Sequence, residues 1–237
     1  MSSCAEKAQS RPLLNREVIG KRADSRPVRV VQFGGGVFLR GFADWMIDAM
    51  NRHDLFNGSV ALVQSVDQKR SEQLRAQDGL YTVRLSGPEQ SVMTDASHVV
   101  DVFSTWLSPQ HDFTAFLRLA ENPDWRYMIS NTTENGLVWL DGDFPRQRAA
   151  DSFPGRLTQL LYHRYRFFQA EPDRGVVCLP CELIPENGTQ LYQLVLRHAQ
   201  RWQLPASFTD WLRRACVFHN TLVDRIVAGY PSDPDKA

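Results

Sequence analysis

A short apolar run that leads directly into three glycines constrains the fold of this chain more than any other feature. The run, Val28–Phe33, has the β-branched, nearly continuous apolar character of a strand that is buried on both faces. Gly34, Gly35 and Gly36 follow it at once, and residues 37–50 then carry apolar side chains at helical spacing. A strand, a glycine turn and a helix in this order predict the opening of a βαβ unit.

Strand-like and helix-like segments alternate along the rest of the chain. A second apolar run at 60–66 lies at a distance from the first that suits a crossover helix and a parallel neighbour. The later segments are predicted as strands at 80–85, 98–103, 127–130 and 175–179, and as helices at 68–77, 113–119, 153–168, 189–202 and 207–216. The sequence therefore predicts an α/β protein with a Rossmann-like, doubly wound, mostly parallel sheet.

The composition narrows the class of partner. Lys plus Arg and Asp plus Glu number 27 each, so the formal net charge of zero gives no electrostatic case for nucleic acid or an anionic membrane surface. No apolar run approaches the length of a membrane span, and four cysteines are too few for a secreted disulfide framework. We therefore expect a cytoplasmic protein with a small-molecule substrate and with no nucleic-acid or membrane partner.

Cys178 and Cys181 form a C-x-x-C pair, which could mark a redox centre or half of a zinc site. Neither a second pair nor a histidine at ligand spacing accompanies it, and Cys178 falls inside an apolar strand. Two buried small hydrophobic residues are the better interpretation, so no metal site is predicted.

The glycine turn has the character of a phosphate site. Gly34 and Gly36 occupy the first two glycine positions of G-x-G-x-x-G, while Leu39 stands at the third. Free N–H groups at the start of the following helix, at Val37 and Phe38, could face a pyrophosphate. The alternative is a strand-to-helix turn without a ligand.

A dinucleotide site also needs an acid after the second strand, where it can accept hydrogen bonds from a ribose. Asp67 follows the run 60–66 and has this position, although its distance from Gly36 is longer than usual. The alternative is a solvated loop aspartate. Lys69 and Arg70 lie close enough to leave a 2′-phosphate, and hence NADP, open.

Five ordered segments resemble the long-chain mannitol dehydrogenase family. They are the glycine-rich opening at 33–41 (FGGGVFLRG), 76–82 (AQDGLYT), 132–136 (TTENG), 181–188 (CELIPENG) and 220–226 (NTLVDRI). The third glycine is commonly absent in that family, so the resemblance removes the objection raised by Leu39.

The resemblance implies NAD as the cofactor and hydride transfer at a sugar carbon as the reaction. It places Thr133 and Glu134 at the cofactor, and Glu182, Asn187 and Arg225 on the substrate side. Asp224 would orient a substrate hydroxyl or a catalytic lysine, and the alternative for Asp224 is a structural pair with Arg225.

The branch of the family can be argued from two further segments. Polyol dehydrogenases and fructuronate reductases of the family usually have C-D-N where this chain has Cys181-Glu182-Leu183. Together with 229–231 (GYP), the Glu-Leu pair resembles the branch in which NADH reduces tagaturonate, a hexuronate, to D-altronate. Leu183 cannot hold the reacting oxygen as an amide does. Fructuronate reduction, polyol oxidation and a non-catalytic nucleotide-binding module remain the alternatives, whereas the matches disfavour a methyltransferase.

The resemblance also gives an expected organisation. Residues 1–27 read as a polar leader, 28–231 as the NAD-binding domain, and 232–237 as the start of a connection to a helical catalytic domain. In the family that helical domain carries the catalytic lysine, and no segment of this chain resembles it. We therefore expect the chain to bind cofactor without turnover, and the helical half to be its partner.

Overall fold

Six parallel strands form the main sheet of the computed structural model, which describes residues 13–20, 25–64, 68–89, 92–132, 136–144 and 147–230. The strands lie in the order β5-β2-β1-β6-β7-β8, and each pairs in parallel with its neighbours. Their bounds are β1 Val28–Phe33, β2 Ser59–Val63, β5 Phe103–Leu107, β6 Tyr127–Ser130, β7 Val177–Pro180 and β8 Val217–Phe218.

The order of the strands creates a switch in the direction of the fold beside β1. The chain first builds outward from β1 through β2 to β5, then returns to place β6 on the other side of β1 and continues to β7 and β8. In open α/β sheets, ligands bind at such a switch point, outside the carboxyl ends of the strands. The predicted Rossmann-like, doubly wound fold is confirmed, although the short strand β8 was not expected.

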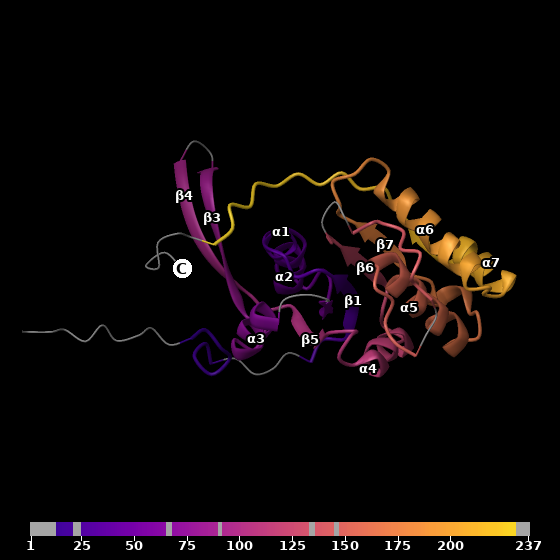
Figure 1. The fold of residues 1–237 in the computed structure, drawn as a ribbon. Coiled ribbons are helices and arrows are strands. Elements are labelled where there is room, and N and C mark those ends of the chain that lie inside the picture. Colours follow the sequence, from indigo (N-terminus) through magenta and orange to yellow (C-terminus); the bar gives the residue numbers. More distant parts are fainter. Residues whose placement is uncertain are drawn as a thin grey trace, which may run out of the picture.

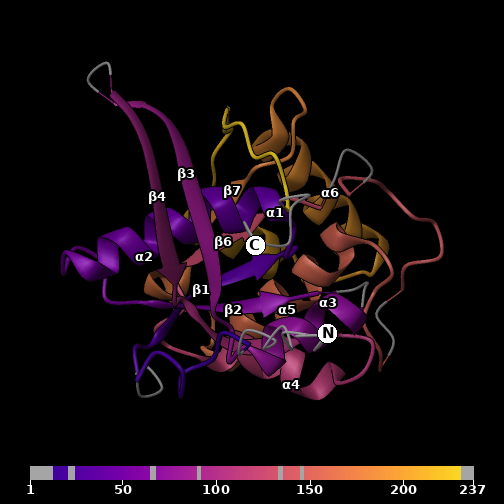
Figure 2. The ribbon, with the colours of Figure 1, turned by 90° about the vertical axis from the view of Figure 1, so that its left-hand side faces the viewer.

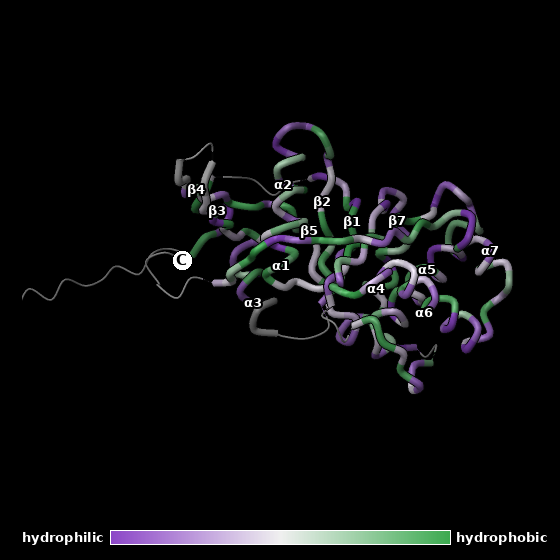
Figure 3. Tube along the Cα trace, turned by 90° about the horizontal axis from the view of Figure 1, so that it is seen from above, coloured by the Kyte–Doolittle hydropathy of each residue, from purple (hydrophilic) through white to green (hydrophobic). Residues whose placement is uncertain are grey.

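Helices cover both faces of the sheet, because alternate residues of each buried strand enter two separate cores. Val31 and Phe33 point into a core that includes residues of α4, α5, α6 and α7, whereas Val30 points into a core with residues of α1, α2 and α3. Figure 3 shows hydrophobic residues concentrated along the central strands. The helices are α3 Gln68–Ala76, α4 Phe113–Arg118, η2 Leu119–Glu121, α5 Phe153–Phe167, η3 Pro172–Arg174, α6 Asn187–Arg201 and α7 Ala206–Ala215. None of these described helices is long and apolar enough to cross a membrane.

The helix after the glycine turn is continuous but not uniform. It consists of α1 (Val37–Leu39), a π-helical turn (Arg40–Asp44) and α2 (Trp45–Arg52). The sequence predicted one regular helix here. A π-turn inserts a residue and rotates the side chains that follow it, a feature that is frequent at functional sites.

A long antiparallel hairpin stands apart from the main sheet. Within the described part of the chain, strands β3 (Tyr81–Glu89) and β4 (Val92–Val100) pair only with each other, and Figures 1 and 2 show the hairpin projecting beside α2. Only its base is anchored in the core, through Tyr81 and Val100.

The hairpin overturns the prediction of a single strand at 98–103. That segment is divided between the end of β4 and the start of β5, which belong to different sheets. The cause lies at Asp101, whose N–H donates to a carboxylate oxygen of Asp48 at 2.9 Å. Periodicity cannot detect this break, because both halves of the segment are apolar.

The described part of the predicted leader contacts the domain. The guanidinium of Arg16 donates two hydrogen bonds to the carboxylate of Asp101, at 2.9 and 2.6 Å. The domain boundary at residue 28 stays a prediction.

Candidate cofactor site

Three strand ends meet at one edge of the sheet. Asn131, which follows β6, donates its backbone N–H to the Phe33 carbonyl of β1 at 3.1 Å. Its side-chain amide donates to the Cys181 carbonyl, which follows β7, at 2.7 Å. Asn131 therefore fixes the ends of β1 and β7 on either side of the switch point.

The glycines of the turn have different structural roles. Gly34 has a φ of +101°, and a Cβ on it would lie 2.5 Å from the carbonyl oxygen of Asn131, so the fold requires glycine there. Gly36 precedes the helix with an ordinary φ of −66°, and a Cβ on it would meet no atom within 4 Å. The open space beside Gly36 and the start of the helix fits a pyrophosphate approaching the backbone. Val37 and Phe38 form the first turn of that helix and are partly exposed.

A buried polar pair lies behind the glycine turn. The side-chain amide of Gln32, on β1, donates to the Gly34 carbonyl at 3.0 Å and to a carboxylate oxygen of Asp44 at 3.2 Å. Both side chains are fully buried. Burial raises the pKa of Asp44 to about 7, against the opposing effects of Gln32, Arg40 and Tyr81. Sequence reasoning missed this pair, yet each member is a polar residue in an apolar run, which is the signal that could have found it.

Glu182 was predicted on the substrate side, and the structure places it under the loop after β6. Its carboxylate accepts hydrogen bonds from the Ser130 hydroxyl at 3.1 Å and from the backbone N–H and the hydroxyl of Thr132, both at 3.0 Å. The residue is only 2% exposed. Glu182 therefore fixes the backbone at Thr132, just after β6, and its contact with substrate stays a prediction.

Asn187, also predicted on the substrate side, joins two of the segments that carry the family resemblance. Its side-chain amide donates to the carbonyls of Pro180, Glu182 and Thr221 at 3.0 to 3.1 Å. Its side-chain oxygen accepts from the N–H groups of Gly188 and Thr221. With 1% exposure, it holds the segment after β8 against the start of α6. Direct recognition of substrate by Asn187 stays a prediction.

The segment 221–230 crosses the molecule in an extended form, from the region of α6 toward the hairpin (Figure 1). Its residues alternate in exposure, so that Arg225 lies over the ring of Trp45, 4.6 Å from the ring centre, while Asp224 is exposed. The outward side also carries Leu222 and Ile226, which are 96% and 95% exposed. Asp224 and Arg225 therefore lie on opposite sides of the segment, and the orienting role of Asp224 stays a prediction.

Three of the predicted cofactor residues, Asp67, Thr133 and Glu134, lie outside the described residues. Their neighbours are placed at the cofactor edge. Gln64 follows β2 there, and a Cβ on Gly35 would lie 2.2 Å from its side-chain nitrogen. Thr132, the last described residue after β6, directly precedes Thr133 and Glu134 in the sequence.

The C-x-x-C pair behaves as two buried residues. Burial raises the pKa of the Cys181 thiol to about 12 and that of the Cys178 thiol well above its usual value. Both thiols are therefore protonated at neutral pH. Among the described residues no group of three or more His, Cys, Asp or Glu is arranged to hold a metal ion.

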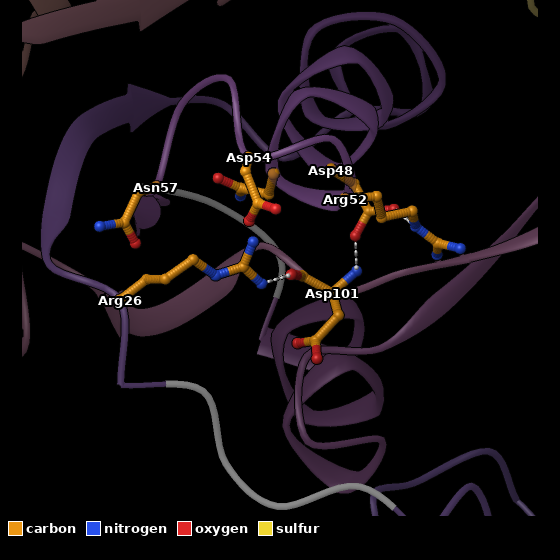
Figure 4. A pocket seen from close by; sticks show the side chains of 7 residues that line it. Arg26, Asp48, Arg52, Asp54, Asn57 and Asp101 are labelled. Atoms are coloured by element: carbon orange, nitrogen blue, oxygen red, sulfur yellow. Dashed lines mark hydrogen bonds and ion pairs between the residues drawn. The ribbon is translucent and has the colours of Figure 1, made fainter.

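A charged pocket of about 630 Å³ lies elsewhere, beside the amino ends of β2 and β5. Figure 4 shows the Arg26 guanidinium donating to the Asp101 carbonyl and the Asp101 N–H donating to the Asp48 carboxylate. The pocket lies at the edge of the sheet opposite the glycine turn, and these bonds fix Asp101 just before β5, so we assign the pocket to the scaffold.

Comparison with known proteins finds sequence matches that cover most of the chain. Residues 28–236 match the family described as the mannitol dehydrogenase Rossmann domain. An altronate oxidoreductase of Yersinia enterocolitica is 43% identical over 210 residues, and one of Bacillus subtilis is 43% identical over 207 residues. These alignments cover 88% and 87% of this chain but 44% and 43% of the relatives, so the chain spans less than half of their length.

Solved structures share the fold. A mannitol 2-dehydrogenase of Pseudomonas fluorescens, in a ternary complex with NAD and D-mannitol, aligns with a TM-score of 0.72 at 20% identity. The alignment covers 90% of this chain and 47% of that one. A D-sorbitol dehydrogenase in substrate-free form aligns with a TM-score of 0.68 at 17% identity, over 87% of this chain and 46% of that one.

Proposed function

Since the chain belongs to the mannitol dehydrogenase family through its Rossmann domain, we propose that it is the cofactor-binding half of an NADH-dependent oxidoreductase of sugar acids. NADH, when bound, supplies the hydride. The residues of this chain bind and orient the cofactor at the carboxyl edge of the sheet. The helical half that carries the proton donor is the proposed partner.

The observation that carries this proposal is the contrast between Gly34 and Gly36. Glycine at 34 is explained by the fold, because a Cβ there would collide with the Asn131 carbonyl. No such contact surrounds Gly36, so its lack of a side chain leaves room for something outside the described chain. A pyrophosphate is the ligand that a strand–glycine–helix turn at a switch point accepts best.

The proposed substrate is tagaturonate, reduced to D-altronate. The support is the identity of 42 to 45% with several altronate oxidoreductases. Leu183 stands 66% exposed beside the buried Glu182, where the polyol enzymes carry an amide. An apolar residue there argues against the polyol chemistry, although fructuronate reduction on the same fold is the second candidate.

The experiment that tests the cofactor site is a fluorescence titration with NADH. Gly36→Val should abolish NADH binding and leave the melting temperature nearly unchanged, since the new side chain occupies the space of the phosphate and its Cβ meets no atom of the fold within 4 Å. Gly142→Val is the matched control, because Gly142 has equally open surroundings on an exposed loop outside the turn. Equal NADH affinity for the native chain and Gly36→Val would remove the site from the turn.

A further inference from the structure

The fully buried pair of Gln32 and Asp44 contains more hydrogen-bond acceptors than the structure satisfies. One carboxylate oxygen of Asp44 accepts from Gln32. Its other oxygen has no partner with hydrogen-bond geometry among the described residues, although the Tyr81 hydroxyl, which donates to the Arg40 carbonyl, is close enough to lower the pKa of Asp44. The side-chain oxygen of Gln32 also has no hydrogen-bond partner there. Two buried acceptors left unpaired are costly, and a proton on Asp44 turns one acceptor oxygen into a donor.

The surroundings of Asp44 carry one positive charge. Arg40 lies on the same π-helical turn, its guanidinium placed over the ring of Tyr81, which reaches over from β3, at 5.7 Å. The Tyr81 hydroxyl donates to the Arg40 carbonyl at 3.1 Å. Cys181, after β7, and Asp48, one turn along α2, are the other titratable groups nearby.

Arg40 is itself engaged elsewhere. One of its nitrogens donates to the Tyr230 hydroxyl at 2.5 Å, and its guanidinium also lies over the Tyr230 ring. The attraction of Arg40 lowers the pKa of Asp44 by less than burial raises it, and the pKa is about 7. The protonation state of Asp44 therefore changes within the physiological range.

We infer that Asp44 is a positioning residue of the glycine turn: the proton on its carboxyl group sets, through Gln32, the conformation in which the turn receives the dinucleotide. Gln32 transmits the effect because one amide group contacts both the Asp44 carboxylate and the Gly34 carbonyl. Ionised Asp44 draws this amide toward itself and away from Gly34. The inference rests on the proposed nucleotide site.

The sign of the effect follows from charge. A pyrophosphate at the turn is an anion, so an ionised Asp44 behind the turn opposes it and a neutral Asp44 does not. Nucleotide affinity is therefore highest below the pKa of Asp44 and falls as the pH rises through it. By reciprocity, bound nucleotide holds the proton on Asp44.

The test combines two measurements on the 237-residue chain. Amide resonances of Gly34, Gly35 and Gly36 are followed by NMR between pH 5.5 and 8.5, and the dissociation constant of ADP-ribose is measured over the same range. ADP-ribose is the probe because it carries the pyrophosphate and is stable in acid. In the native chain the turn amides should titrate near neutrality, and the affinity at pH 8.5 should be about five-fold or more below that at pH 5.5.

Three variants distinguish the coupling of Asp44 to the glycine turn from other effects of pH on the chain. Asp44→Asn should keep the high affinity at every pH and remove the titration of the turn. Gln32→Leu should disconnect the turn from Asp44, so that its amides no longer titrate. Asp48→Asn, which neutralises a buried carboxylate of the same helix that faces Asp101 and Arg52, should retain the native pH profile.

The outcomes distinguish this inference from the proposed function. Turn amides whose titration survives in Asp44→Asn overturn the inference, whatever binds. ADP-ribose affinity that is independent of pH in the native chain overturns it as well, while the nucleotide site stands. Turn amides that titrate through Asp44 in a chain that binds no ADP-ribose at any pH support the link to the turn and refute the proposed function.

Discussion

Asn187 and Thr221 hold each other by hydrogen bonds in both directions: the Asn187 amide donates to the Thr221 carbonyl at 3.1 Å, and the Thr221 N–H donates to the Asn187 oxygen at 2.9 Å. This exchange connects the start of α6 to the segment that leaves the domain. The two segments come closest at the residue after Asn187, where a Cβ on Gly188 would lie 2.3 Å from the His219 carbonyl oxygen. The path of residues 219–221 thus depends on residues 187 and 188.

Asn187→Ala should therefore lower the free energy of unfolding by about 2–4 kcal/mol, because several buried backbone groups lose their partner at once. Chemical denaturation measures the change. Asn220→Ala is the control, since Asn220 bonds Thr189 at an exposed position and its loss should cost about 1 kcal/mol or less. Equal losses for both variants would show that Asn187 does not hold the segment.

A second prediction concerns stability in acid. His198 is fully buried between the rings of Trp139 and Trp202, and burial lowers its pKa to about 4. In the unfolded chain His198 binds a proton near pH 6.5, whereas in the folded chain it stays neutral down to about pH 4. The contribution of neutral His198 to the free energy of unfolding is therefore complete above pH 6.5 and is lost as the pH falls toward 4.

The loss attributable to His198 should reach about 3 kcal/mol, the equivalent of its pKa shift. Denaturation curves at pH 7, 5.5 and 4.5 measure it. His198→Gln should flatten the decline, whereas His53→Gln, at an exposed position, should leave it unchanged. A native chain as stable at pH 4.5 as at pH 7 would contradict the prediction.

A third prediction tests the acid expected at the ribose. Asp67→Ala should weaken NADH binding by about 1–2 kcal/mol, the loss expected for charge-assisted hydrogen bonds. NADPH should be weakened less, because a negative charge near its 2′-phosphate is removed. Titration of both cofactors gives the ratio, and unchanged discrimination would indicate that Ser65 or Gln68 holds the ribose instead.

The fourth prediction concerns the proposed helical half. Hydride transfer to a ketone needs a proton donor at the oxygen, an effect typically worth about 10² to 10⁴ in rate. The chain alone should bind NADH without oxidising it when tagaturonate, fructuronate or fructose is added, whereas the helical half of an altronate oxidoreductase added in trans should restore turnover. NADH absorbance measures both.

We expect the outward apolar side chains of the segment 221–230, Leu222 and Ile226, to contact that half. Replacing both Leu222 and Ile226 by glutamate should abolish complementation while NADH binding is retained, because a desolvated charge opposes docking. Leu55→Glu is the control, since Leu55 is another exposed leucine (75%) but lies after α2, outside the segment 221–230. Robust turnover by the chain alone would mean that it already contains a complete active site.

Most of the architecture could be predicted from the sequence, because local periodicity decided it. The strand Val28–Phe33 and the helices beginning at Phe113 and Phe153 are found where the apolar spacing placed them. The hairpin could not be predicted, since its separation from the sheet depends on a contact between Asp101 and Asp48, far apart in sequence.

The position of the candidate site could be predicted from the sequence, but the roles of its individual residues could not. The glycine turn follows from local spacing, whereas the roles of Glu182 and Asn187 depend on carbonyls and N–H groups brought in from other strands. Gln32 and Asp44 were missed because only the π-turn and the packing of β3 bring them under the turn.

The projecting hairpin has a consequence for the behaviour of concentrated protein. In the described chain, strands β3 and β4 pair only with each other, so no other strand covers the two long edges of the hairpin. The ion pair of Arg84 and Asp95, about half exposed, joins the two strands of the hairpin, and pairing with a second hairpin would remove these charged groups from water, which disfavours such pairing.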